Sequence, residues 1–420
     1  MVACVLAAVS LRGVASCFSA FIKRYLGHEN AATPSYWTIR LWMLRIGYYK
    51  LIRSKQQADD WVWIVDHTVQ TGPHKCFVVL GVRLSALGQS CVLTAEDVEP
   101  LAIEPVLTSN GEIVDAQFEE VERRTGVPQA IIMDNGSDLH KGGQKYSEKK
   151  PGVIIVGDIT HKCARELKKL LEEHEAWAPF TKRVNQFKRE VQQTPLAALA
   201  PPAQRTKSRY MNVDVLAKWT RQILIPTADD PGSAAAILKC ETDAVINKLS
   251  WVEQFRGVVT LCDELALTVE IINEVVRTEG YGERTPATLD HLLPPPTCET
   301  VERLQTTLRD FVADQSAVVI ENGLTRLPGS TEILESVFGR LKHLEGEQAH
   351  GGLTGSVLSV AAFASTTSNE EIRKAVERVK VKDVRDWVKS KFGQTTQAAR
   401  RLLRDAFGEE QKQDHCEAFC

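Results

Sequence analysis

The spacing of apolar residues in the N-terminal part of the chain is helical. Residues 1 to about 56 predict three short helices: an apolar first segment, a second over Ser10–Ala15, and a third over Tyr36–Tyr49. A start signal for the third helix is present at Pro34-Ser35, because serine is a favoured N-terminal cap. This part of the chain is therefore expected to contribute helices only.

From Asp60 the pattern becomes that of strands. Trp61–Val69 and Cys76–Val82 flank turn residues at Thr71-Gly72-Pro73 and predict a hairpin, and a further strand is expected within Cys91–Val106. The next expected elements are an amphipathic helix and two strands, over Asn110–Arg124, Ala130–Met133 and Val153–Val156. The middle of the chain is therefore predicted to be mixed α/β.

After His161 helical spacing returns for a long stretch. The helices expected there cover Cys163–Glu173, Trp177–Gln192, Val213–Leu224, Ala234–Arg256, Val258–Glu279 and Cys298–Asn322. Trp251 and Phe255 are expected to pack in the core of this part rather than to stack on a nucleic-acid base. Three further helices are predicted over Glu332–His343, Asn369–Lys391 and Thr395–Gln411.

Two of the predicted strands end on an aspartate. Asp66 closes Trp61-Val-Trp-Ile-Val-Asp66, and Asp134 closes Gln129-Ala-Ile-Ile-Met-Asp134. A carboxylate at the tip of a buried strand needs a partner, and hard divalent cations such as Mg²⁺ bind one or two carboxylates together with substrate phosphates. Each aspartate alone is also compatible with a simple turn cap. Together they favour a metal site for phosphodiester chemistry.

A third acid for such a site is expected on the predicted helix Glu332–His343. Glu332 and Glu335 share one face, whereas Ile333, Leu334, Val337, Phe338 and Leu341 form the apolar stripe. Lys342 follows Glu335 by two helical turns and is a candidate phosphate contact. We expect Glu335 to be the third acid, with Glu332 as the alternative.

The overall composition is that of an ordinary soluble protein, with 43% apolar residues, 25% charged residues and a net charge of −3. This charge argues against coating nucleic acid over the whole surface, but residues 1–55 contain eight Lys or Arg and one acid. A helix-turn-helix-like DNA-binding module would fit, with Arg40, Arg45 and Lys50 as candidate contacts; a helical cap with a solvated basic face is the alternative.

Cysteine usage and hydropathy bear on the compartment. The ten cysteines are scattered singly without a Cys-x-x-Cys pair, which favours a reducing cytoplasm. No stretch approaches the roughly 20 apolar residues needed to span a bilayer, so no membrane partner is expected.

The strand-end acids and the order of elements resemble those of a DDE transposase of the ribonuclease H-like superfamily. In that fold the first and fourth strands are adjacent, which would bring Asp66 and Asp134 together. The chain is similar to the bacterial insertion-sequence group with an all-helical insertion before the last catalytic helix, and Asp158-Ile-Thr-His161 resembles a motif of the hAT and Mutator-like relatives.

The resemblance implies a function and a set of roles. Asp66, Asp134 and Glu335 would be catalytic and hold two Mg²⁺ or Mn²⁺ ions. Lys342 and His161 would contact DNA or its phosphates, and Asp158 would support His161 or simply cap the following helix. The expected activity is cleavage and strand transfer of mobile-element ends in double-stranded DNA, by a homodimer or larger assembly associated with a bacterial-type nucleoid.

The fold class expected is α/β: a ribonuclease H-like mixed sheet with a large all-α insertion and flanking helices. The expected domains are a DNA-binding module, the first part of the catalytic core, the insertion, the final catalytic helix and a basic helical tail, covering residues 1–58, 59–162, 163–327, 328–350 and 351–420. Alternatives are a nuclease of the same fold without strand transfer, a transposase-derived regulator without catalysis, and an unrelated α/β binding protein.

Overall fold

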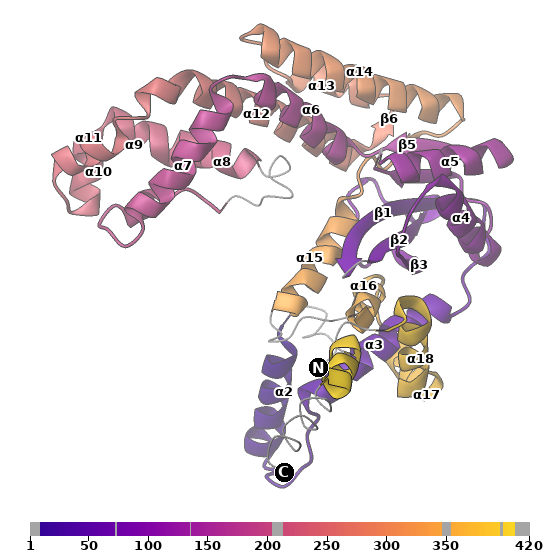
Figure 1. Ribbon diagram of the computed structural model, residues 1–420. Helices are drawn as coiled ribbons and strands as arrows, with labels where there is room; N and C mark the ends of the chain where they lie inside the picture. The colour runs from indigo at the N-terminus through magenta and orange to yellow at the C-terminus, as the bar shows by residue number, and fades with distance from the viewer. Residues whose placement is uncertain are drawn as a thin grey trace. The chain divides into compact units, whose positions relative to one another are not determined.

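The computed structural model describes residues 9–71, 74–134, 136–203, 213–346, 354–394 and 398–407. The chain forms two compact units (Figure 1). Residues 1–89, 93–156 and 331–420 form the sheet unit, and residues 90–92 and 157–330 form the helical unit. The expected first apolar segment up to residue 8, the turn residues Gly72-Pro73 and the ends of the expected last helix lie outside the described residues.

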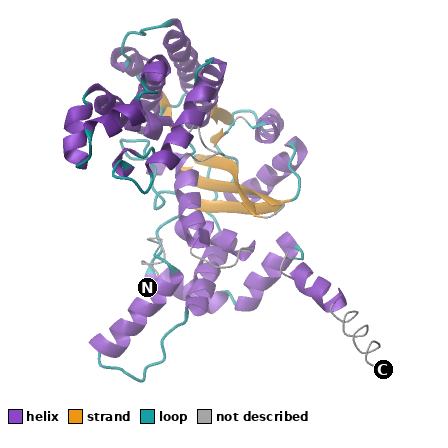
Figure 2. Cartoon of the chain, turned by 60° about the vertical axis from the view of Figure 1, so that its left-hand side comes forward, coloured by secondary structure: helices purple, strands orange, loops and turns teal. Residues whose placement is uncertain are grey.

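A five-stranded sheet forms the centre of the sheet unit, with its strands drawn in orange in Figure 2. The strand order is β3-β2-β1-β4-β5, and the strands are β1 (Trp61–Thr71), β2 (His74–Arg83), β3 (Glu99–Val106), β4 (Ala130–Met133) and β5 (Ile154–Gly157). The sheet is mixed, since β1 pairs antiparallel with β2 and parallel with β4. The predicted hairpin and the predicted adjacency of the first and fourth strands are confirmed. The third strand begins at Glu99 rather than near Cys91.

One face of the sheet is covered by α4 (Gly111–Thr125) and α5 (Ser137–Lys149). Trp61, Trp63 and Val65, which alternate along β1, point into this core. The helix predicted over Asn110–Arg124 is confirmed as α4, which is capped by Asn110 and ends at Gly126, whose φ of 88° suits glycine.

Helix α5 was not predicted. Few of its residues are apolar, and Leu139 and Tyr146 are the only large ones that reach the core. Its glycines have a packing role: a Cβ on Gly142 would lie 2.4 Å from Cβ of Val114 in α4. These glycines allow α5 to approach α4 closely.

The helices that contact β1 and β3 apart from the α4–α5 core come from both ends of the sheet unit. They are α3 (Tyr36–Ile52), α15 (Glu332–Gly346), α16 (Leu358–Phe363) and α18 (Val381–Phe392), and α17 (Asn369–Arg378) packs on α3. The remaining described helices of this unit are α2 (Leu11–Ala20), the π-helix η1 (Phe21–Tyr25), the 3₁₀ turns η2 (Leu84–Ala86) and η7 (Thr354–Val357), and residues 398–407.

Two details of these helices differ from expectation. The single helix expected over Asn369–Lys391 is broken at Val379–Lys380, where both residues have extended backbone angles. Helix α16 was not predicted, because a short segment that is buried on all sides has no amphipathic pattern.

The helical unit contains most of the elements expected in the insertion. Its main helices are α6 (Ile159–Glu173), α7 (Trp177–Val191), α8 (Val213–Trp219), α9 (Ile225–Asp229), α10 (Pro231–Leu238), α11 (Thr242–Leu249), α12 (Arg256–Glu279), α13 (Thr285–Leu292) and α14 (Glu299–Glu321). Short turns and a two-stranded ribbon complete it: η3 (Ala197–Leu199), η5 (Thr220–Leu224), η6 (Glu253–Phe255), β6 (Tyr281–Gly282) and β7 (Arg326–Leu327).

The helix expected over Ala234–Arg256 is in fact α10, α11 and η6, and α13 and the ribbon were not predicted. Trp251 and Phe255 are buried, as expected, in an aromatic cluster with Phe180 and Phe187. Within the described residues, no helix has the length and apolar character that a bilayer crossing requires. The chain is thus a mixed α/β protein with a five-stranded mixed sheet and mostly helical remainder, compatible with a ribonuclease H-like fold carrying a helical insertion.

Candidate metal centre

Asp66 lies on the face of β1 opposite the α4–α5 core. Side chains alternate along a strand, and Val65 points into that core, so Asp66 points away from it. The side chain is buried, with 7% of the residue exposed, and its Oδ1 accepts a hydrogen bond from the backbone N–H of His67 at 2.6 Å. Pairing of β1 with β2 is irregular directly after Asp66, between Asp66 and Val69. Such irregularities redirect side chains next to functional sites.

Asp134 follows the neighbouring parallel strand. Val65 lies opposite Met133, so Asp66 and Asp134 occupy the next positions along the two adjacent strands. Asp134 directly follows β4, but Asp66 lies within β1, which continues to Thr71, so the prediction that Asp66 closes its strand is wrong. Met133 belongs to the α4–α5 core, and alternation therefore directs Asp134, which is half-buried, to the same face as Asp66.

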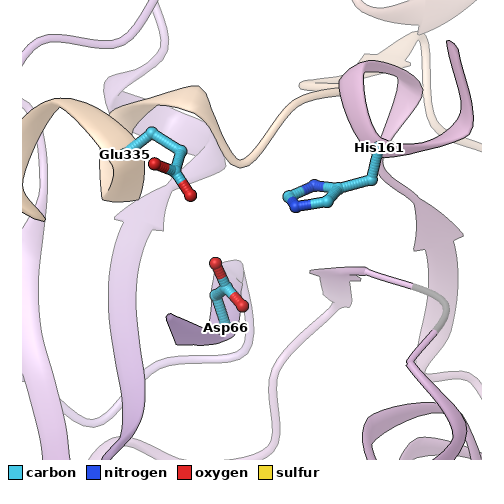
Figure 3. Close-up of side chains that lie close together, drawn as sticks. All are labelled: Asp66, His161 and Glu335. Carbon is cyan, nitrogen blue, oxygen red and sulfur yellow. The ribbon is translucent and has the colours of Figure 1, made fainter. Parts of the chain in front are cut away.

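Glu335 is brought to Asp66 by the packing of α15 on β1. The predicted apolar stripe is confirmed: Ile333, Leu334, Val337, Phe338 and Leu341 are all buried. Burying this stripe leaves Glu335 half-buried, and a carboxylate oxygen of Glu335 lies within 4.8 Å of one of Asp66. Figure 3 shows the two carboxylates pointing toward one another.

The other acids considered do not join this group. Among the described residues, the group that contains Asp66 and Glu335 includes neither Glu332 nor Asp134, and Glu332 is exposed. The group therefore contains the glutamate that the sequence favoured, and Asp134 directly follows the adjacent strand.

The donor set of Asp66 and Glu335 fits a hard divalent cation. Two like charges less than 5 Å apart repel by about 3–4 kcal/mol at an effective dielectric constant of about 20. A cation between them removes this cost, and carboxylate oxygens are the ligands that Mg²⁺ and Mn²⁺ prefer. The arrangement can therefore hold a metal of this class.

Asp158 and His161 belong to the helical unit. Asp158 caps α6: its Oδ1 accepts from the backbone N–H groups of Thr160 and His161 at 2.5 and 3.1 Å. Its Oδ2 lies 3.1 Å from Nδ1 of His161, which orients the imidazole drawn in Figure 3. The capping role weighed for Asp158 is thus confirmed, and the same carboxylate also holds His161.

The candidate DNA contacts on α3 need a correction. Lys50 has no exposed surface, and its Nζ lies 2.6 and 2.9 Å from the backbone oxygens of Ala364 and Ser365. The guanidinium of Arg45 donates to the backbone oxygens of Val376 and Val379, and Arg40 donates to Ser356 at 3.3 Å. These cations bind the C-terminal segment of the chain, and the prediction that Lys50 contacts DNA is wrong. Lys342, by contrast, is exposed on α15.

One neighbouring residue was missed by sequence reasoning. His67 follows Asp66, and its Nδ1 lies 3.4 Å from Oδ2 of Asp138 in the first turn of α5. Burial lowers the pKa of His67, and the nearby Asp138 carboxylate opposes this effect. The pair connects the backbone after Asp66 to the helix after Asp134. No sequence signal marked it, because α5 was not recognised.

Comparison with known proteins does not assign the chain to a family. No family model and no curated protein matches the chain. Among solved structures, the chain is similar to the Drosophila P element transposase in its strand transfer complex, with 10% sequence identity and a TM-score of 0.37. That similarity covers 87% of this chain and 93% of the other. The function proposed for the chain rests on its own side chains.

Proposed function

We propose that the chain is a DDE-type transposase, which cleaves the ends of a mobile element in double-stranded DNA and joins them to a target by in-line phosphoryl transfer. The observation that carries this proposal is the approach of Asp66 and Glu335 to within 4.8 Å. They come from distant parts of the sequence and meet on one face of the sheet, and Asp134 ends the adjacent parallel strand. Carboxylates that serve only as caps would not be brought this close together, because they repel each other.

In this proposal Asp66 and Glu335, with Asp134 beside them, hold Mg²⁺ or Mn²⁺. When bound, such ions supply Lewis-acid activation of the phosphoryl group and of the attacking water or 3′-hydroxyl. Burial of Asp66 and anchoring of Glu335 on α15 fix the two carboxylates before substrate arrives. The exposed Lys342, two turns after Glu335, is assigned a phosphate contact, and His161, oriented by Asp158, a contact to the DNA strand. By resemblance to the family, we further propose that the site holds two ions, that the protein acts as a dimer and that it associates with the nucleoid.

The test uses two isosteric substitutions that remove charge, Asp66→Asn and Glu335→Gln. The matched control is Glu332→Gln, which makes the same change one turn earlier on the same helix at an exposed position. We expect Mg²⁺-dependent cleavage of duplexes carrying the DNA flanking the encoding gene to fall by at least about 10²–10³-fold in the first two variants. The control should keep wild-type activity.

Calorimetric titration with Mn²⁺ gives a second readout, with binding lost in Asp66→Asn and retained in Glu332→Gln. Equal cleavage by wild type and Asp66→Asn would end the proposal, and so would absence of both Mn²⁺ binding and cleavage in the wild type. A duplex with a pre-cut 3′-hydroxyl end separates the nuclease alternative, since a transposase joins that end to a target and a nuclease does not.

A further inference from the structure

The cations of the helical unit fall into two groups. Many are held by carboxylates of the same unit, as in the pairs Lys162–Glu166, Arg183–Glu190, Lys218–Glu270, Arg221–Asp263, Arg256–Asp229, Arg277–Glu274, Arg303–Glu173 and Arg309–Asp290. Arg165, Lys168 and Lys169 on α6 belong to the second group, of exposed cations without an ion pair to a described residue, which also includes Lys182, Arg189 and Lys239. Their charge is therefore not neutralised within the described part of the chain.

These three residues lie on one side of α6. The opposite side is buried through Ile159, Cys163, Leu167, Leu170 and Leu171. On the exposed side, Arg165 and Lys168 follow His161 by four and seven residues, so His161, Arg165 and Lys168 lie along one line of the helix surface. Lys169 lies beside this line. We call Arg165, Lys168 and Lys169 the α6 basic face. Glu172, one turn later on the same line, ends it.

We infer that the α6 basic face binds the phosphodiester backbone of a DNA duplex, continuing from the strand contact assigned to His161. This inference rests on the proposed function and adds where the duplex is held. From His161 to Lys169 the helix rises by about 12 Å, at about 1.5 Å per residue. This matches three to four base pairs at about 3.4 Å each. Long, flexible cations that are not held in ion pairs suit phosphates rather than base edges, so the contact is independent of DNA sequence.

The test measures how duplex binding depends on salt, by fluorescence anisotropy with a labelled duplex of about 30 base pairs. Each phosphate contact contributes about 0.9 to the slope of log K against log salt. We expect the variant Arg165→Ala/Lys168→Ala/Lys169→Ala to lower the magnitude of the slope by about 2.7. Between 50 and 200 mM salt, the loss of affinity should then be about 40-fold smaller than in the wild type.

The matched control is Arg256→Ala/Arg303→Ala/Arg309→Ala, which removes the same charge from the same unit at cations already paired with acids. Its slope should equal that of the wild type. If both triple variants change the slope equally, net charge explains the effect and the inference is wrong. It is also wrong if the α6 variant, shown by circular dichroism to be folded, keeps the wild-type slope.

Asp66→Asn separates this inference from the proposed function. We expect it to abolish cleavage and leave the salt slope unchanged. If the wild type never cleaves DNA but the α6 variant has a smaller salt slope, the α6 contact is supported and the transposase proposal is rejected. If the wild type cleaves DNA but the α6 variant keeps the wild-type salt slope, the transposase proposal is supported and the α6 contact is rejected. Competition by poly-glutamate as effective as that by DNA of equal charge would indicate an acidic protein partner and overturn the assignment.

Discussion

The buried ammonium of Lys50 gives the most direct test of the sheet unit. It lies at the C-terminal end of α16, where the last carbonyls of a helix have no intrahelical partner. Nζ is 2.6 Å from the oxygen of Ala364, 2.9 Å from that of Ser365 and 3.4 Å from that of Ala362. In Lys50→Met the side-chain volume is nearly kept and these carbonyls lose their donor. We expect the free energy of unfolding at pH 7 to fall by about 1–3 kcal/mol.

The pH dependence gives this prediction a sign. Burial lowers the pKa of Lys50 from 10.5 to about 8. Between these values the unfolded chain binds the proton and the folded chain has released it, so stability rises with pH. The contribution of Lys50 is therefore complete above pH 10.5 and is lost as pH falls through about 8. The gap between wild type and Lys50→Met should widen by up to about 3 kcal/mol over this window.

Urea unfolding, followed by tryptophan fluorescence at pH 7, 8, 9 and 10, measures both quantities. Taking the difference between the two proteins removes the titration of groups that they share. A variant as stable as the wild type at pH 7 with an unchanged m-value would refute the capping role. A gap that stays constant from pH 8 to 10 would refute the lowered pKa.

Three further substitutions test the packing and the caps. Gly47→Ala should destabilise the protein by about 1–3 kcal/mol in urea unfolding despite the better helix propensity of alanine, because its Cβ would lie 1.9 Å from the backbone oxygen of Leu358; unchanged stability would contradict the close approach of α3 and α16. Trp63→Ala, between Phe118 and Tyr146, should cost about 3–5 kcal/mol by the same measurement, and a loss below 1 kcal/mol would show that this core is not tightly packed. Asp158→Ala should speed hydrogen exchange at the amides of Thr160 and His161 by about 5–30-fold, whereas equal rates would reject the cap.

Local patterns were enough to predict several elements. The apolar run Trp61–Val65, the Ser35 cap and the stripe of α15 are each visible in short stretches of sequence, and each is present in the structure. The parallel pairing of β1 with β4 followed from the order of elements. The approach of Glu335 to Asp66 could not be derived from local patterns, because it depends on how α15 packs against β1.

The basic residues of α3 could not be assigned for a related reason. Helix α3 is covered by α16, α17 and β3, and its cations bind backbone carbonyls from residues more than 300 positions later. From sequence alone, a lysine without a nearby acid is expected to be exposed. The partners of Lys50 are backbone carbonyls at the C-terminal end of α16, a helix that the apolar spacing did not predict. The same limit concealed α5, whose glycines, rather than apolar residues, permit its contact with α4.

The interrupted course of the sheet unit has a consequence for protein synthesis. About 270 residues separate Asp66 from Glu335, and the whole helical unit is translated between them. At about 5–20 residues per second, a ribosome needs roughly 15–50 s to supply the second carboxylate after the first. A nascent chain, or one stopped early by a nonsense codon, therefore carries Asp66 without its glutamate, so completion of the polypeptide itself controls when the acidic pair first exists.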